Sequence, residues 1–284
     1  GGAGMAETFE FASLVDGAVV VLKEPSIERK AAMTRALAEQ WQSGVVAEVR
    51  LASTPAPPLH PGRPAGLNVV QPKDAPRRGK GGSLASRVAM LHSLVHIESV
   101  AIDLSWDVVA RFVDEDMPRA FFDDWAKVAE DEARHFQLLK ARMEELGGSY
   151  GDLPVHDGLW ESALATAGSL QERLAIEHMV HEGRGLDVMP KTIARFRSSG
   201  DKATATLLAE IIVDEATHVG AGVRWFSHLV EREEPGADPV PRFHAVVRRK
   251  FSGLLKAPFN DELRAGAGMS PEWYMPLTVR ENAE

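Results

Sequence analysis

One pentapeptide pattern, Asp-Glu-Ala-x-His, occurs twice in this chain, as DEARH at residues 131–135 and as DEATH at residues 214–218. Each copy has a Glu three residues before a His, a spacing that puts both side chains on one face of a helix. A single Glu-x-x-His arises easily by chance in a chain of 284 residues, but a repeat that keeps the Asp and the Ala does not. The repeat therefore predicts two equivalent helical segments, each presenting a carboxylate and an imidazole to one point.

The sequence around the repeat predicts an all-α fold. Apolar residues recur at helical spacing, strand patterns are nearly absent, and helix boundaries are marked by Gly147, by Asp201 and by a capping box of Ser169 with Glu172. Pro190 predicts a kink in the third of four long helices. The predicted long helices cover residues 83–113, 118–146, 169–199 and 201–231.

The remaining segments surround these helices. We expect a first helix over residues 27–50, a Pro- and Gly-rich arm or linker over 53–82, and a further helix at 239–255 followed by an irregular tail. Arg63, Arg77 and Arg78 of the arm are interpreted as surface charges, with contact to an anionic ligand as the alternative. The predicted organisation is a single domain with four parts: a cloning scar at 1–4, the first helix and arm at 5–82, the four helices at 83–231, and the C-terminal helix and tail at 232–284.

Helix geometry predicts which carboxylates accompany the two motifs. Di-metal sites in helical bundles take Glu-x-x-His from two helices and a single Glu from each of the other two. Antiparallel helices bring residues at equal distance from their turn to one height. Glu132 lies 16 residues beyond a turn near residue 116, and Glu98 lies 18 before it. Glu215 lies 15 residues beyond a turn near residue 200, and Glu182 lies 18 before it.

Six metal ligands follow, namely Glu98, Glu132, His135, Glu182, Glu215 and His218. Glu177 is the rival to Glu182, but in an α-helix it lies about 7.5 Å away along the axis. Asp131 and Asp214 precede each His by four residues and are predicted to orient the imidazoles by hydrogen bonding. The connection over 147–168 is long enough to run back along a helix, which predicts a ferritin-like four-helix bundle with a crossover between its second and third helices.

The donor set predicts the metal. Carboxylate and imidazole ligands suit iron or manganese, and the chain has no Cys for zinc-thiolate or cluster sites. We therefore expect two iron ions, or iron with manganese. A net charge of −9 argues against nucleic acid as a partner, and no apolar run approaches the roughly 20 residues that span a bilayer. These features predict a cytoplasmic protein that does not enter a membrane.

Several longer segments resemble a known family. LHSLVHIESVAIDLSWDVVARF, FFDDWAKVAEDEARHFQLLKARMEELGGSYGDLPVHDGLW, EGRGLDVMP and VDEATHVGAGVRWF are similar to a bacterial domain-of-unknown-function family of the ferritin-like superfamily. The resemblance implies a dinuclear site at the six positions named above. A more distant likeness is to a di-iron hydroxylase that modifies a tRNA adenosine. The segment IEHMVHEGRGLD departs from the family pattern. It makes Glu177 and His178 candidate additional ligands, with His178 as a proton donor, or as a partnered or solvated histidine, as the alternatives.

The predicted activity is an O2-dependent oxidation or hydroxylation of a small organic molecule by a non-haem di-iron oxidoreductase, with electrons supplied by a reductase. Three alternatives stay open at this point: a ferroxidase or metal-handling protein, a tRNA-nucleoside hydroxylase, and a bundle in which metal serves stability alone.

Overall fold

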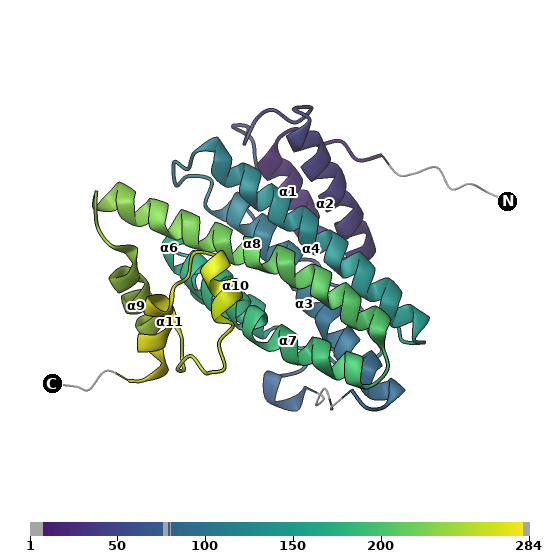
Figure 1. The fold of residues 1–284 in the computed structure, drawn as a ribbon. Coiled ribbons are helices and arrows are strands. Elements are labelled where there is room, and N and C mark those ends of the chain that lie inside the picture. The colour runs from purple at the N-terminus through teal and green to yellow at the C-terminus, as the bar shows by residue number, and fades with distance from the viewer. Residues whose placement is uncertain (1–7, 76–78, 80, 281–284) are drawn as a thin grey trace. The chain divides into compact units, whose positions relative to one another are not determined.

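A computed structural model describes residues 8–75, 79 and 81–280 (Figure 1). This part of the chain is all-helical, and its one β contact is an isolated bridge between Val69 and Val155. The predicted scar at 1–4 and the arm residues Arg77 and Arg78 lie outside it. The helical elements are α1 Leu14–Lys23, α2 Ile27–Gln42, η1 Pro72–Asp74, α3 Leu84–Arg111, α4 Arg119–Glu145, α5 Gly158–Ala165, α6 Leu170–Arg173, η2 Leu174–His181, α7 Glu182–Ser198, α8 Lys202–Glu233, α9 Pro239–Lys250, α10 Asp261–Gly266, α11 Pro271–Tyr274 and η3 Met275–Thr278.

The four long helices predicted from the sequence are present as α3, α4, the continuous run α6–η2–α7, and α8. Ser169 accepts a hydrogen bond from the Glu172 backbone N–H, and Asp201 accepts one from Thr204, so both predicted caps form. α7 continues through Pro190. The departure from α-helical hydrogen bonding lies earlier, in η2, which is a π-helix.

Two differences concern the N-terminal region. The helix expected over 27–50 ends at Gln42, and a separate helix, α1, precedes it. α1 has the sequence LVDGAVVVLK, whose valines and glycine have low helix propensity, so a short apolar run of this kind does not by itself predict a helix. Burial of seven of its ten residues stabilises it in the folded chain.

The described residues form two compact units. The first contains the chain up to Leu67 together with Ile97–Gln137, and the second contains Asn68–His96 together with the chain from Leu138 onward. α3 and α4 therefore each contribute residues to both units. The ferritin-like bundle and the boundaries at 82/83 and 231/232 stay predictions.

In the first unit, buried charges join the Pro-rich arm to the helices. The Lys30 ammonium donates to Asp103 at 2.6 Å and to the Gly62 carbonyl at 3.1 Å, and the Arg63 guanidinium also pairs with Asp103. A Cβ on Gly62 would lie 2.4 Å from the Lys23 carbonyl, so only glycine allows the arm to pass this close to α1. Arg63 is therefore a partner of a buried carboxylate, and not the surface charge that the sequence suggested.

In the second unit, α8 packs along α7 and η2, while α9 packs on α11 (Figure 1). The connection over residues 147–168, which the sequence predicts to be a crossover and which is named the crossover segment, is bound by two histidines of α3. His92 Nε2 accepts the Gly151 backbone N–H at 2.9 Å, and His96 contacts the Tyr150 hydroxyl at 2.9 Å and the His156 carbonyl at 3.1 Å. Burial lowers the pKa of His92, which keeps its ring neutral and able to accept.

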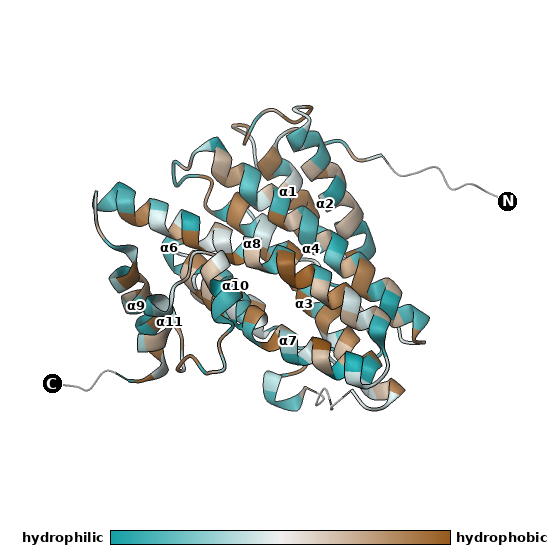
Figure 2. Cartoon of the chain, viewed as in Figure 1, coloured by the Kyte–Doolittle hydropathy of each residue, from teal (hydrophilic) through white to brown (hydrophobic). Residues whose placement is uncertain are grey.

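Hydropathy agrees with buried helices. Figure 2 shows hydrophobic and hydrophilic residues alternating along α8, as a helix with one buried face requires. Among the described helices, α3 alone is long and apolar enough to cross a bilayer, but 72% of its most apolar window is buried, as in the core helix of a soluble protein.

Candidate metal centre

The first motif lies on α4, where Glu132 and His135 share one buried face and Glu98 of α3 lies beside them. His135 Nδ1 is 3.6 Å from Glu132 Oε2 and 3.7 Å from Glu98 Oε2. All three residues are at most 4% exposed. The distances are longer than an N–H···O hydrogen bond and fit donor atoms that each lie about 2 Å from one shared ion. The first unit thus presents two carboxylates and one imidazole at the separation of metal ligands.

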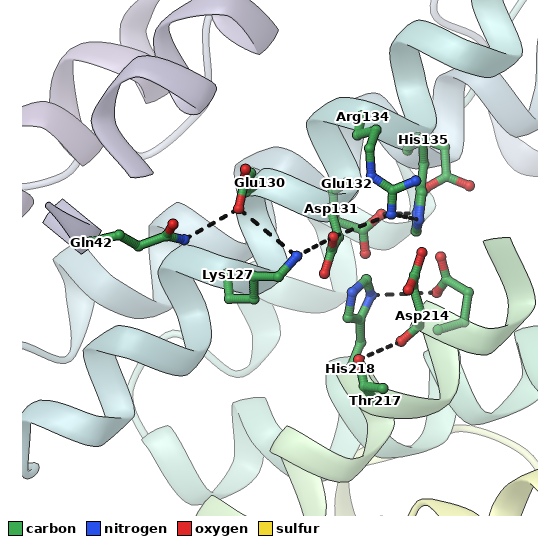
Figure 3. A network of polar contacts seen from close by, with 12 residues as sticks. Gln42, Lys127, Glu130, Asp131, Glu132, Arg134, His135, Asp214, Thr217 and His218 are labelled. Carbon is green, nitrogen blue, oxygen red and sulfur yellow. Dashed lines mark hydrogen bonds and ion pairs between the residues drawn. The ribbon is translucent and has the colours of Figure 1, made fainter. Parts of the chain in front are cut away.

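Asp131 contacts cations on the same helix. Its carboxylate accepts from Lys127 at 2.5 Å and from Arg134 at 3.3 Å, and Arg134 Nη2 lies 3.5 Å from His135 Nε2 (Figure 3). Asp131 therefore holds the guanidinium that faces the far side of the His135 ring. A direct hydrogen bond from this ring to Asp131 stays a prediction. Arg134 occupies the variable position of the pentapeptide, so the repeat gave no signal for it.

The second motif lies on α8 and repeats the geometry of the first. His218 Nδ1 is 3.7 Å from Glu215 Oε2. The same two atoms of His135 and Glu132 are 3.6 Å apart. His218 is buried, and Glu215 is half-buried. The Thr217 hydroxyl donates to the backbone carbonyl of Asp214 at 2.7 Å (Figure 3). The predicted role of the Asp214 side chain toward His218 stays a prediction.

Glu182 begins α7 and contacts His178. The imidazole Nδ1 of His178 lies 2.7 Å from Glu182 Oε1, and the ring is fully buried. His178 is thus a partnered histidine, and its partner is the carboxylate of the predicted ligand Glu182. That contact is compatible with a role in orienting Glu182.

The π-helix η2 changes how Glu177 relates to Glu182. The Glu182 N–H donates to the Glu177 carbonyl five residues earlier, so one turn of η2 closes between them. In an α-helix, residues five apart point about 140° away from each other. The separation assigned to Glu177 from α-helical geometry therefore does not apply. π-helical turns are rare and concentrate at functional sites, and no sequence pattern predicted this one.

Glu177 is a buried acid whose pKa is raised. Burial raises the pKa of Glu177 to about 7, opposed by the nearby Ser162 hydroxyl and by the positive charge of Arg173. Ser162 Oγ also lies 3.2 Å from His181 Nε2, and burial lowers the pKa of His181. Ser162 lies in the crossover segment, where no motif marks it, so the sequence did not identify this contact.

α8 approaches η2 closely at a glycine. A Cβ on Gly222 would lie 3.0 Å from the His178 carbonyl and 3.1 Å from the His178 Cβ, closer than most real contacts. A Cβ on Gly220 would meet only ordinary contacts from 3.7 Å. Gly222 therefore permits the backbone of α8 to pack against the π-helix, whereas Gly220 has no such steric requirement.

The side chains that could offer a ligand atom to a metal ion form a group of Glu98, Glu132 and His135 in the first unit, together with Glu215 in the second. Among the predicted ligands outside this group, His218 is paired with Glu215 and Glu182 with His178, both within the second unit. The structure thus assigns each of the six predicted ligands at least one carboxylate or imidazole neighbour.

Comparisons with known proteins give a family and no activity. A family model described as "Protein of unknown function (DUF455)" matches residues 23–275. An "Uncharacterized protein" of Haemophilus influenzae is 34% identical over 234 residues, which covers 80% of this chain and 76% of the relative. No solved structure matches.

Proposed function

We propose that this chain, which belongs to the DUF455 family, is a ferritin-like di-metal oxidoreductase that activates O2 to oxidise a small organic molecule. The observation that carries the proposal is the duplicated Glu–His geometry. On both α4 and α8, the Nδ1 of a buried His lies 3.6–3.7 Å from the Glu three residues before it. Glu98 and Glu182 supply the additional carboxylates that a dinuclear centre requires.

The donor set fits iron or manganese. Four carboxylates offset the charge of two divalent cations, and a mixture of carboxylate and imidazole is the ligand type that non-haem iron takes. Six side chains would hold the ions, namely Glu98, Glu132, His135, Glu182, Glu215 and His218. Two iron ions, or iron with manganese, would supply the electrons that reduce O2. The bundle that joins the two halves, formed by α3, α4, α7 and α8, is part of the proposal.

A neighbouring residue would keep one of the ligands in place. His178 holds the Glu182 carboxylate at 2.7 Å. Ligands fixed in this way need no reorganisation when metal binds, and loss of such a supporting partner typically lowers metal affinity about 10- to 100-fold.

The charges on α9 bear on the tRNA alternative, which needs a free basic patch. α9 ends in Arg248, Arg249 and Lys250, but Glu172 pairs with Arg249 at 2.8 Å and with Lys250 at 2.9 Å. The Arg248 guanidinium donates to the Pro276 and Val279 carbonyls. These cations hold α9 to neighbouring segments of the second unit, which supports a small-molecule substrate over a nucleic acid.

The test is the reaction of the Fe(II)-loaded protein with O2, followed by absorbance and by an oxygen electrode. We expect oxidation of about two iron ions per chain and then arrest until a reductant is added. Oxidation of many more iron ions per chain would instead show a ferroxidase. Bound iron that does not react with O2 would leave only a stabilising role and would refute the proposed activity.

A further inference from the structure

A cavity of about 260 Å³ lies in the second unit, beside the π-helix. Its walls come from the end of η2, from the first turns of α7, from the segment between α9 and α10, and from α10 itself. The Arg184 guanidinium donates to the Lys256 carbonyl at 2.6 Å, and the Leu255 N–H donates to the Leu277 carbonyl at 3.0 Å, so the wall segment is held in place. The lining includes Val180, His181, Arg184, Lys256, Phe259 and Arg264.

The cavity has an excess of positive charge. Arg264 is buried and donates to both carboxylate oxygens of Asp187 at 2.8 Å, so one cation and the one acidic side chain of the lining offset each other. Arg184 is 3.6 Å from the same Asp187, with 43% of its side chain exposed. Lys256 is exposed, and no carboxylate in the described ranges forms an ion pair with it. Three cations against one anion leave a surplus of two positive charges, in a chain whose net charge is −9.

The rest of the lining is largely apolar. Val180, Phe251, Leu254, Leu255 and Phe259 all contribute to the walls. At about 30 Å³ for each water-sized group, 260 Å³ holds roughly nine such groups. Apolar walls with a few charged groups are typical of sites for small organic ligands. The complementary molecule has one anionic group and an apolar body of about eight carbon atoms.

We propose that this cavity binds a small amphipathic anion, with Lys256 and Arg184 facing its charged group and the apolar side chains contacting its body. Val180 and His181 immediately precede the candidate ligand Glu182 in the chain. Identification of the bound molecule with the substrate of the metal centre rests on the proposed function. Binding itself does not require the metal, so the two ideas can fail separately.

The test is isothermal titration calorimetry on the full-length protein treated with EDTA, with octanoate as the first probe. We expect one octanoate per chain. 1-Heptanol, which has the same seven-carbon body without the charge, should bind about tenfold more weakly. Affinity should rise roughly threefold per methylene from butanoate to octanoate and then level off, because the cavity is full. Titrations with octyl phosphate and with inorganic phosphate, run beside octanoate, show whether the cavity binds a phosphorylated amphipathic molecule or free phosphate.

Variants of an exposed lysine test the charge without endangering the fold. Lys256→Gln should weaken octanoate binding about threefold and Lys256→Glu about tenfold, which are effects expected of exposed ion pairs. Lys191→Gln and Lys191→Glu, at an exposed lysine of α7 outside the lining, are the matched controls and should bind octanoate as the wild type does. Three results would overturn the proposal: no saturable octanoate binding, equal affinity for 1-heptanol, or equal affinity in the Lys256 and Lys191 variants. Inorganic phosphate binding as tightly as octyl phosphate would do so as well.

Discussion

Two buried acidic residues on α3, five positions apart, meet different partners. Asp103 is compensated by cations of the chain itself, Lys30 and Arg63. Glu98 faces His135, which also faces Glu132, at distances suited to a shared ion. A buried carboxylate is costly unless a positive partner accompanies it. One helix therefore carries two kinds of buried carboxylate. Asp103 is neutralised by cations of the chain, and Glu98 belongs to a carboxylate–imidazole cluster for which we propose a metal cation.

The largest expected effect concerns the Asp103 cluster. Lys30→Ala leaves a buried carboxylate with one cation fewer, and should lower the free energy of unfolding by about 3–5 kcal/mol. Lys23→Ala, at an exposed lysine of α1, is the matched control and should change it by less than about 0.5 kcal/mol. Urea denaturation at pH 7 measures both. A Lys30→Ala loss no larger than that of the control would show that Asp103 does not depend on its buried partner.

The next largest effect is a dependence of the free energy of unfolding on pH, which comes from Glu177. The pKa of Glu177 is about 7 in the folded protein against 4.5 in the unfolded chain. Because the folded state holds this proton more tightly, the associated stability is fully present below pH 4.5 and is lost as the pH rises to 7. Relative to the wild type, metal-free Glu177→Gln should therefore gain up to about 3 kcal/mol between pH 4.5 and pH 8.

Denaturation of both proteins across this range in EDTA provides the measurement. A constant difference between wild type and Glu177→Gln at every pH would show that the buried carboxyl titrates normally.

A substitution beside Glu98 should raise the free energy of unfolding, whereas Lys30→Ala lowers it. Without metal, Glu132→Gln removes one of two neighbouring buried carboxylates and should raise the free energy of unfolding by about 1–2 kcal/mol. With Fe(II) at 100 times its dissociation constant, the wild type should gain about 2.7 kcal/mol and the variant little. Glu130→Gln, two residues earlier, should show neither change. Thermal unfolding with EDTA and with Fe(II) tests the reversal, and a Glu132→Gln variant that Fe(II) stabilises as much as the wild type would break the comparison.

The smallest effect compares two glycines of α8. Gly222→Ala places a Cβ 3.0 Å from the His178 carbonyl, and should destabilise the protein by about 1–2 kcal/mol through overpacking. Gly220→Ala meets no contact closer than 3.7 Å and should stabilise α8 by up to about 1 kcal/mol. Chemical denaturation of the two variants decides the matter. Equal effects would mean that η2 does not require the close approach of α8 at Gly222.

The sequence predicted those features of the fold that follow local rules. α3, α4 and α8 appear within a few residues of their predicted ends, because periodic apolar residues and caps such as Ser169 and Asp201 specify helices locally. α1 was missed because its valines indicate no single secondary structure, and its helix is stabilised by burial. The π-helix was missed because no residue pattern distinguished it from an α-helix; in the structure it packs against α8 at Gly222.

The candidate site likewise contains residues that local rules predicted and contacts that they did not. The repeated motif and helix geometry predicted Glu132, His135, Glu215 and His218 with the Glu–His spacing that the structure shows on each helix. Glu98 was predicted from its height on the preceding helix and lies beside His135. The contacts of Arg134, Ser162 and His178 depend on side-chain packing, which no spacing rule determines.

The most direct measurement is the metal content of Fe(II)-reconstituted protein by elemental analysis, wild type beside Glu132→Ala/Glu215→Ala. The matched control is Glu130→Ala/Glu210→Ala, at acidic residues on the same two helices that are not among the proposed ligands. A dinuclear centre predicts about two ions per chain in the wild type and the control, and loss of both in the ligand variant. A folded wild type that binds no iron or manganese, or a ligand variant that retains both ions, would contradict the proposed metal centre.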